Sequence, residues 1–194
     1  KLRPAGRAEV MIHSRHCAAT GATRGQHRIG NKSDRREPVH PLLSPGKAWP
    51  TSRGMSASDI FDRGLRRVRR DRVFTAYPAH DFVRRFMIDG ILDRLGMVTR
   101  RFADVLDMGC FMGDFTPQSV ERIARVDAGS RFAGAAGGVQ ADEDRLPFAD
   151  GSFDLVVSAG VLDSVNDLPG ALVLARRVLR SDGLLLAAFA GGGS

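Results

Sequence analysis

Short apolar runs alternate with glycine turns and helical stretches from residue 103 to residue 190. Strands and helices that alternate in this way build a parallel sheet with helices on both faces, joined by right-handed crossovers. The pattern therefore predicts the α/β fold class with a mostly parallel sheet, and a ligand would bind at the carboxyl ends of the strands. The runs with strand character are residues 103–107, 123–127, 138–141, 153–158 and 184–190.

Two helices are predicted ahead of the sheet. The first is a basic helix that follows Asp62. A solvated face paired with neighbouring Asp residues is the favoured interpretation of its arginines, and a grip on phosphate is the alternative. The second covers residues 80–95, where an apolar face at helical spacing is formed by Phe82, Val83, Phe86, Met87, Ile91 and Leu95. The arginines of the first helix are Arg63, Arg66, Arg67, Arg69, Arg70 and Arg72.

Proline, glycine and capping residues indicate where the helices and strands of the sheet domain begin and end. If Thr116 caps a helix that begins at Pro117, only about a turn and a half fits before the next strand, so the first crossover helix is predicted to be truncated. Asp167 is predicted to cap the last helix, and residues 181–183 to turn the chain into the fifth strand. The chain ends at Ser194, which predicts a sheet truncated after an unpaired fifth strand.

The formal net charge of +7 belongs to the first part of the chain. Residues 1–54 hold 11 basic and 3 acidic residues, whereas residues 55–194 hold 18 basic and 19 acidic ones. A basic balance normally indicates nucleic acid or an anionic surface as a partner. Because residues 55–194 carry a charge of −1, no nucleic-acid partner is predicted for the folded domain.

Residues 1–54 show no helical or alternating apolar periodicity, and Gly, Pro, Ser and Arg interrupt every potential element. They are predicted to form a disordered basic tail. Translation upstream of a start at Met55 is the favoured account of this tail, with an organellar targeting peptide and a nucleic-acid-binding arm as alternatives. An N-terminal helical segment at residues 55–102 and a sheet domain at residues 103–194 would follow.

Several classes of protein are excluded by the cysteines and the apolar runs. Cys17 and Cys110 cannot form a disulfide framework and lack the spacing of a zinc site, so no metal is expected and a reducing compartment is the default. No transmembrane segment is predicted, because no apolar run approaches the roughly 20 residues of a spanning helix. A G-x-x-x-x-G-K-[ST] loop is also missing, which argues against a nucleotide hydrolase.

Acidic residues stand at the carboxyl ends of three predicted strands, and this ordered set carries the functional argument. Asp107 leads into a turn at Gly109, where the lack of a side chain lets the backbone approach a ligand. Asp127 lies twenty residues further on, where a carboxylate can accept both hydroxyl hydrogens of a ribose. Asp142 and Glu143 follow the third strand, within reach of an adenine amino group.

At these residues the sequence resembles the class I methyltransferases that use S-adenosylmethionine. Residues 107–113 are similar to their first motif, D-x-G-x-G-x-G, with Phe111 in place of the middle glycine. Residues 142–158 are similar to the stretch between their third and fourth strands. Within the superfamily, three segments resemble the branch of the mitochondrial complex I assembly factor that hydroxylates an arginine, its alphaproteobacterial relatives and, more distantly, the biotin-pathway malonyl-carrier-protein methyltransferase. These segments are residues 61–63 with the arginines that follow, residues 80–82 and residues 165–170.

The resemblance covers residues 58–194 and implies a Rossmann-like class I methyltransferase fold with S-adenosylmethionine as the cofactor. It implies that Asp127 holds the ribose and Asp142 the adenine, while Asp107 borders the methionine part and Ser158 faces the sulfonium side. No catalytic residue is named, because methyl transfer needs little beyond bringing a nucleophile in line with an activated methyl. The implied cofactor-binding residues are Asp107, Gly109, Gly113, Asp127, Asp142, Glu143 and Ser158.

Three functions follow from the resemblance. The main one is a methyltransferase with a small-molecule or protein acceptor, in the bacterial cytoplasm or alternatively in mitochondria. A hydroxylase is the second, although His80 is the only histidine after residue 55 and such iron sites commonly use two histidines. A non-catalytic relative that assists respiratory complex I, with a complex I subunit as its partner, is the third. The nearest relatives carry a His-Trp pair where this chain has Asp163 and Ser164.

Overall fold

The computed structural model describes residues 9–13, 59–118 and 120–191, with residues 9–13 described by their backbone pairing. In these ranges the chain forms one sheet with the strand order β1-β6-β5-β2-β3-β4. Neighbouring strands are parallel except for β1 and β6, which are antiparallel. The strands are β1 (Glu9–His13), β2 (Asp104–Met108), β3 (Arg122–Asp127), β4 (Val139–Gln140), β5 (Phe153–Ala159) and β6 (Leu179–Phe189).

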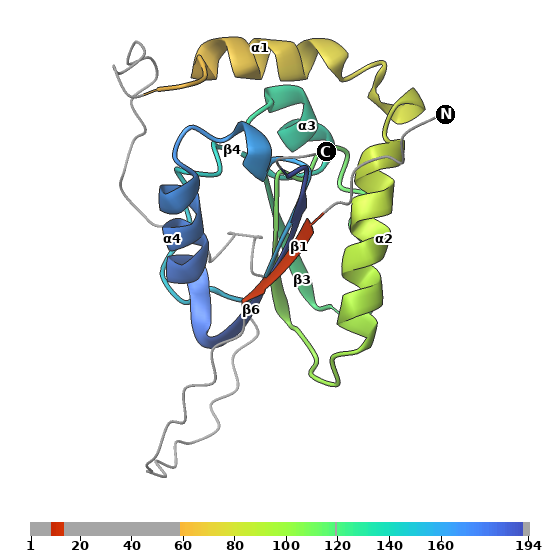
Figure 1. The fold of residues 1–194 in the computed structure, drawn as a ribbon, viewed down its shortest axis with the longest axis vertical. Helices are drawn as coiled ribbons and strands as arrows, with labels where there is room; N and C mark the ends of the chain where they lie inside the picture. The colour runs from red at the N-terminus through yellow and green to blue at the C-terminus, as the bar shows by residue number, and fades with distance from the viewer. Residues whose placement is uncertain (1–8, 14–58, 119, 192–194) are drawn as a thin grey trace, which may run out of the picture.

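Helices cover both faces of this sheet and one of its ends (Figure 1). The helix α2 packs on one face and α4 on the other, while α1 and α3 lie at the edge where the parallel strands end. In the described ranges, no helix is long and apolar enough to span a membrane. The helices are α1 (Arg63–Val73), α2 (Phe82–Gly96), α3 (Ser130–Ala135) and α4 (Leu168–Val178), with 3-10 turns η1 (Tyr77–Ala79) and η2 (Leu162–Ser164).

Two apolar layers, one on each face of the sheet, hold α2 and α4. Side chains of successive strand residues point to opposite faces, so Leu106 packs with α4 whereas its neighbour Val105 packs with α2. Every residue of β2 and β5 is buried, as expected of central strands in a parallel sheet. The predicted α/β class and the five strands are therefore confirmed. Asp167 caps α4 as predicted, since its carboxylate accepts a hydrogen bond from the Gly170 N–H at 2.8 Å.

The edge of β6 is paired, which corrects the prediction of an unpaired fifth strand. Residues 9–13 form β1 and pair with β6, with Val10 opposite Ala188. The prediction that residues 1–54 contain no element is wrong at this point; the rest of the predicted tail and the accounts of its origin lie outside the described residues. An open edge presents unpaired N–H and C=O groups. Three consecutive apolar residues at positions 10–12 are too few to show periodicity, but they supply a partner for that edge.

Two predictions about the connections are also wrong. The link from β2 to β3 contains no helix at its described residues 109–118 and 120–121, although the sequence predicts a truncated one. Pro117 in a segment this short removes a backbone donor, so the crossover is irregular. Residues 181–183 do not precede the fifth strand but lie within it at a shift of the pairing register, because β6 already begins with Leu179 opposite Phe153 and resumes with Leu184 opposite Leu155.

The buried face of α2 includes only part of the predicted one, since Met87 and Ile91 are buried as predicted. Phe82 and Phe86 are 72% and 69% exposed, whereas Met87, Ile88 and Ile91 are buried against the sheet. Apolar residues occur on most sides of this helix, so helical spacing alone does not select the side that meets the strands. The contact with β5 and β6 makes that selection.

Candidate functional site

Acidic residues meet at the carboxyl edge of the sheet, as the strand order requires. Asp107 and Asp127 lie within the last two residues of β2 and β3, and Ser158 within the last two of β5. Asp142 and Glu143 follow β4. Each of these five residues is at most 2% exposed. The structure therefore brings these five predicted site residues from four segments together, and we call this part of the sheet the acidic edge.

The Asp127 carboxylate accepts four hydrogen bonds from within the protein. The backbone N–H groups of Phe111 and Gly129 donate to its carboxylate at 2.9 and 2.8 Å. Arg70 of α1 donates two more, from Nε at 2.7 Å and from Nη2 at 2.6 Å. A carboxylate has about four acceptor positions, so these four donors saturate it. Burial acts to lower the pKa of Arg70, but the contact with Asp127 outweighs burial and raises it.

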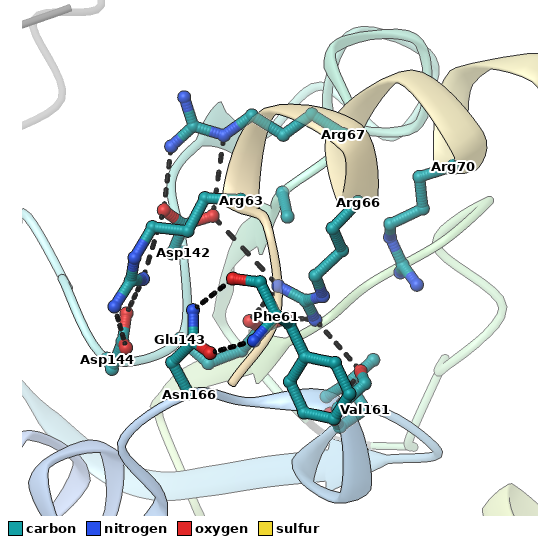
Figure 2. Close-up of polar contacts among 12 residues, drawn as sticks. Phe61, Arg63, Arg66, Arg67, Arg70, Asp142, Glu143, Asp144, Val161 and Asn166 are labelled. Atoms are coloured by element: carbon teal, nitrogen blue, oxygen red, sulfur yellow. Dashed lines mark hydrogen bonds and ion pairs between the residues drawn. The ribbon is translucent and has the colours of Figure 1, made fainter. Parts of the chain in front are cut away.

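The acidic residues that follow β4 are held by the same helix (Figure 2). Arg66 forks onto Glu143, with its two Nη atoms 2.8 and 3.0 Å from the carboxylate oxygens. Arg67 donates to Asp142 from Nη2 at 2.7 Å and from Nε at 3.4 Å. Planar guanidinium groups match carboxylates in this two-point geometry. Both acidic side chains are thus neutralised by partners more than 70 residues away in the sequence.

Asp144 extends this set beyond the predicted residues. Arg63 forks onto it with both N–O distances at 2.6 Å, and this hydrogen bonding raises the pKa of Arg63 above its ordinary value. The prediction of a solvated arginine face is therefore wrong for four arginines, whose side chains are only 12–34% exposed. Their spacing of three, four and seven residues places them on one side of the helix. These inward arginines are Arg63, Arg66, Arg67 and Arg70.

Polar contacts also hold the two ends of α1. At its amino end, the Phe61 N–H donates to Asn166 Oδ1 at 2.6 Å and Asn166 Nδ2 donates to the Phe61 carbonyl at 2.8 Å. Toward its carboxyl end, Asp71 accepts hydrogen bonds from the Ser130 hydroxyl at 2.7 Å and the Arg131 N–H at 3.0 Å. No residue of α1 is buried. The helix therefore rests on the acidic edge through charged and polar groups.

Asp107 has a different environment. Neither of its carboxylate oxygens has a hydrogen-bond partner, and Arg84 Nη2 lies 3.5 Å from Oδ1. Arg84 is itself buried and directs its Nη1 donors at the carbonyls of Gly109 and Ala159, at 2.8 and 2.6 Å. Burial raises the pKa of Asp107 to about 6, although the charge of Arg84 opposes the shift. The Ser158 hydroxyl beside this strand end also lacks a hydrogen-bond partner.

The two glycines of the predicted turn have different surroundings. Gly109 has a φ of +78°, and a Cβ at this position would lie 2.5 Å from the Val161 side chain. Only glycine fits such a left-handed, crowded position. Gly113 also has a positive φ, but its neighbours are Arg125 and Ala136. The structure thus places Gly109 at the acidic edge and Gly113 beside β3 and the end of α3.

Phe111, which replaces the middle glycine of the motif, packs among aromatic and cationic groups. In the described ranges it is the only non-glycine residue with a positive φ, at +48°. Its ring stacks on Tyr77 with the centroids 4.9 Å apart, and the Arg70 guanidinium lies 3.9 Å from its centroid. Cation–π contacts of this kind are attractive. Phe111 therefore connects the glycine turn to α1 and η1.

Sequence reasoning missed Arg84 and Tyr77 as residues of this edge. A signal for Arg84 does exist, since it lies three, four and seven residues before Met87, Ile88 and Ile91 and so shares their buried side. Tyr77 has no such signal. Burial raises the pKa of its phenol, and its hydroxyl has no hydrogen-bond partner.

The edge is suited to hold a ligand that donates hydrogen bonds. Its polar groups are carboxylates, strand-end carbonyls and a serine hydroxyl, and these recognise hydroxyl, amino and ammonium groups. Among the described residues, no group of three or more His, Cys, Asp or Glu is arranged to hold a metal ion.

Comparison with known proteins identifies the family. Residues 95–187 match the family described as "Methyltransferase domain". The protein named "Arginine-hydroxylase NDUFAF5, mitochondrial" from Danio rerio is 30% identical over 167 residues, which cover 79% of this chain and 52% of that protein. The malonyl-[acyl-carrier protein] O-methyltransferase of Enterobacter lignolyticus is 30% identical over 125 residues, covering 56% of this chain and 47% of that protein. The chain thus spans about half the length of these curated relatives.

A solved structure agrees at the level of the fold. The SAM-dependent methyltransferase from Thermotoga maritima superposes with a TM-score of 0.50 and 24% identity, over 60% of this chain and 58% of that one. The match to the Danio rerio protein covers a larger share of this chain than residues 58–194 make up, so the resemblance also reaches into the segment before residue 58, where none was expected. From the fold, the acidic strand ends and these relatives, the chain belongs to the class I methyltransferase family, in the branch that includes the mitochondrial arginine-hydroxylase.

Proposed function

We propose that the acidic edge binds S-adenosylmethionine and that the protein is a methyltransferase acting on a small-molecule or protein acceptor. The observation that carries this proposal is the ordered set of buried carboxylates at the ends of β2, β3 and β4. In a parallel sheet this edge is where ligands bind. Membership of the methyltransferase family supports the same assignment.

The residues at the edge fit the chemical groups of this cofactor. The Asp127 carboxylate suits two ribose hydroxyl donors, and the Asp142 carboxylate suits an adenine amino group. The oxygens of Asp107 and the Ser158 hydroxyl are buried polar atoms that lack a hydrogen-bond partner within the protein, although Arg84 forms an ion pair with Asp107. Such atoms are rare in folded proteins and call for an explanation. A ligand with donor groups provides one.

The protein's own contribution is to bind and orient. S-adenosylmethionine supplies an activated methyl group when bound, so the chain has to bring an acceptor into line and exclude water. Burial raises the pKa of the Cys110 thiol, which therefore stays protonated and is a poor nucleophile. Cys110 is therefore not the expected methyl acceptor.

The ion pairs between α1 and the acidic edge favour a second candidate function, that of a non-catalytic relative. Arginines of α1 already hold Asp127, Asp142 and Glu143, as expected of a relative that keeps the fold without turnover. Such a protein would assist the assembly of respiratory complex I, with a complex I subunit as its partner. A hydroxylase like the Danio rerio relative is the catalytic form of this second candidate.

Titration of the full chain with S-adenosylmethionine, followed by isothermal calorimetry, tests the main proposal. Saturable binding is expected, and Asp127→Ala should weaken it at least about tenfold because the ribose loses its acceptor. Asp150→Ala is the matched control, since Asp150 is an exposed carboxylate paired with Arg177. Because Asp127 also holds Arg70, the comparison is repeated with Arg70→Gln in both chains, and equal affinity there would contradict the assigned ribose site.

A further inference from the structure

We propose that α1 is an autoinhibitory clasp whose inward arginines exclude the cofactor from the acidic edge. The inference rests on the proposed function, because it takes Asp127 and the acidic residues after β4 as the cofactor's binding groups. Closure of α1 and binding of S-adenosylmethionine then compete for the same carboxylates. The inward arginines are Arg63, Arg66, Arg67 and Arg70.

The competition is clearest at Asp127. Its two oxygens receive the Phe111 and Gly129 backbone N–H groups and both arms of the Arg70 fork. Because a carboxylate offers about four acceptor positions, no position is left for a ribose hydroxyl. The backbone donors belong to the glycine turn and to the segment after β3, whereas Arg70 belongs to a separate helix. Arg70 is therefore the group that has to leave.

The acidic residues after β4 are blocked in the same manner. Asp142 faces three guanidinium groups, with Arg67 at 2.7 Å, Arg63 at 3.5 Å and Arg66 at 4.0 Å. Glu143 holds the Arg66 fork, and Arg66 also donates to Ser164 at 3.3 Å. Figure 2 shows these side chains descending from α1 onto the segment that follows β4. An adenine ring could reach these carboxylates only after the helix has moved.

The attachment of α1 is of a kind that can open. No residue of α1 is buried, and its apolar residues Leu65 and Val68 are 44% and 54% exposed. Lifting the helix therefore costs ion pairs, hydrogen bonds and the contact of the Arg70 guanidinium with the Phe111 ring, and leaves both apolar layers of the sheet intact. Ion pairs at partly exposed positions are weakened by salt. The clasp should accordingly loosen as ionic strength rises.

The charge balance explains why the helix closes in the absence of a ligand. Asp127, Asp142, Glu143 and Asp144 would lose their counter-charges if α1 moved away. Four carboxylates would then lie near one another at one edge, and like charges repel. The opened edge would attract a ligand that donates hydrogen bonds and carries positive charge, and the sulfonium cofactor has both properties. The same carboxylates thus favour closure by α1 and binding of the cofactor, one at a time.

The test compares cofactor affinity and helix opening in the same full-length chains. The variant Arg66→Gln/Arg67→Gln/Arg70→Gln removes the forks, and Arg72→Gln is the matched control, because Arg72 is an exposed arginine of the same helix. Calorimetric titration with S-adenosylmethionine should give a dissociation constant at least about tenfold lower for the triple variant, as expected when a mostly closed population is released. Arg72→Gln should stay within about twofold of wild type.

Amide hydrogen exchange on the ligand-free chains measures the clasp without the cofactor. Exchange across α1 should accelerate in the triple variant and remain at the wild-type rate in Arg72→Gln, while exchange in β2 and β5 should not change. If exchange across α1 accelerates but wild type and triple variant bind the cofactor equally, the clasp is overturned and the proposed function stands. If none of the chains binds S-adenosylmethionine, the proposed function falls and the clasp falls with it.

Discussion

Two clusters of arginines and carboxylates lie at opposite ends of the sheet. Both consist of ion pairs, but they differ in the elements that those ion pairs connect. At the amino ends of the strands, Asp104 receives Arg122 and Arg180, each at 2.6 Å. Asp154 accepts the backbone N–H groups of Ala103 and Asp104 at 2.8 and 3.1 Å. At the carboxyl ends, the inward arginines of α1 hold the acidic edge.

The difference lies in where the partners come from. In the amino-end cluster, Asp104, Arg122, Asp154 and Arg180 belong to β2, β3, β5 and β6. Each contact ties one strand of the sheet to another, so it cannot open without the sheet. At the carboxyl end, the carboxylates belong to the sheet segments and the arginines to a helix without buried residues. That cluster can separate while the sheet remains folded.

The pKa shifts follow the same division. At Asp104, burial acts to raise the pKa, but the hydrogen bonds from Arg180 and Arg122 outweigh burial and the pKa is lowered. At Asp107, burial dominates and the pKa is raised to about 6. At Asp104 the arginine contacts outweigh burial, whereas at Asp107 burial outweighs the charge of Arg84.

The largest expected effect comes from breaking the amino-end cluster. Asp154→Ala should destabilise the fold by about 3 kcal/mol, because it leaves the two N–H groups at the start of β2 without an acceptor and removes a carboxylate from Arg180. Urea unfolding followed by circular dichroism measures the change. Asp150→Ala, at an exposed ion pair, should shift stability by less than about 0.5 kcal/mol. A loss for Asp154→Ala no larger than that of the control would remove the distinction between the two clusters.

Part of this architecture could be predicted from the sequence, because buried strands and helices have a periodic pattern of apolar residues. The strands that carry Asp107 and Asp127 at or next to their last residue stand out as apolar runs, and their order places both residues at one edge. The cap at Asp167 is equally visible, because a side chain that accepts a hydrogen bond from the next turn acts locally. Local and periodic features are readable without knowing the partners.

The ion-pair partners of the charged residues could not be predicted from the sequence. Arg70 and Asp127 are 57 residues apart, and nothing in either segment selects the other. Spacing places the inward arginines of α1 on one face, but a solvated face and a face on buried carboxylates have the same spacing. The pairing of β1 with β6 is hidden for a related reason, since it depends on an edge formed by distant residues.

The environment of Asp107 predicts a stability that depends on pH. Its folded pKa of about 6 lies above the ordinary value of 3.8. Between these values the folded state binds more protons than the unfolded state, so this residue lowers stability as pH rises from about 4 to about 6. Asp107→Asn removes the buried charge and should stabilise the fold near pH 7 by on the order of 2–3 kcal/mol. The gain should disappear near pH 4, where the native carboxyl is protonated.

Thermal unfolding of wild type and Asp107→Asn between pH 4 and pH 7.5 measures this difference. Asp104→Asn is the control with the opposite sign, because a lowered folded pKa makes Asp104 stabilising above its unfolded pKa and that stability is lost in acid. Equal pH profiles for wild type and Asp107→Asn would show that the charge at Asp107 is compensated in the folded chain.

The smallest effect is expected for a single arginine of the clasp, and it is the sharpest test of the comparison. Arg67→Gln removes the most exposed inward arginine, yet Asp142 keeps Arg63 at 3.5 Å and Arg66 at 4.0 Å. The remaining positive charges compensate the carboxylate, so the free energy of unfolding should fall by less than about 1 kcal/mol. Urea unfolding at low and at high salt measures it, and the difference from wild type should shrink at high salt. A loss as large as that of Asp154→Ala would mean that α1 is as much a part of the fold as the strands, and the carboxyl-end cluster would then be structural in the same sense as the amino-end one.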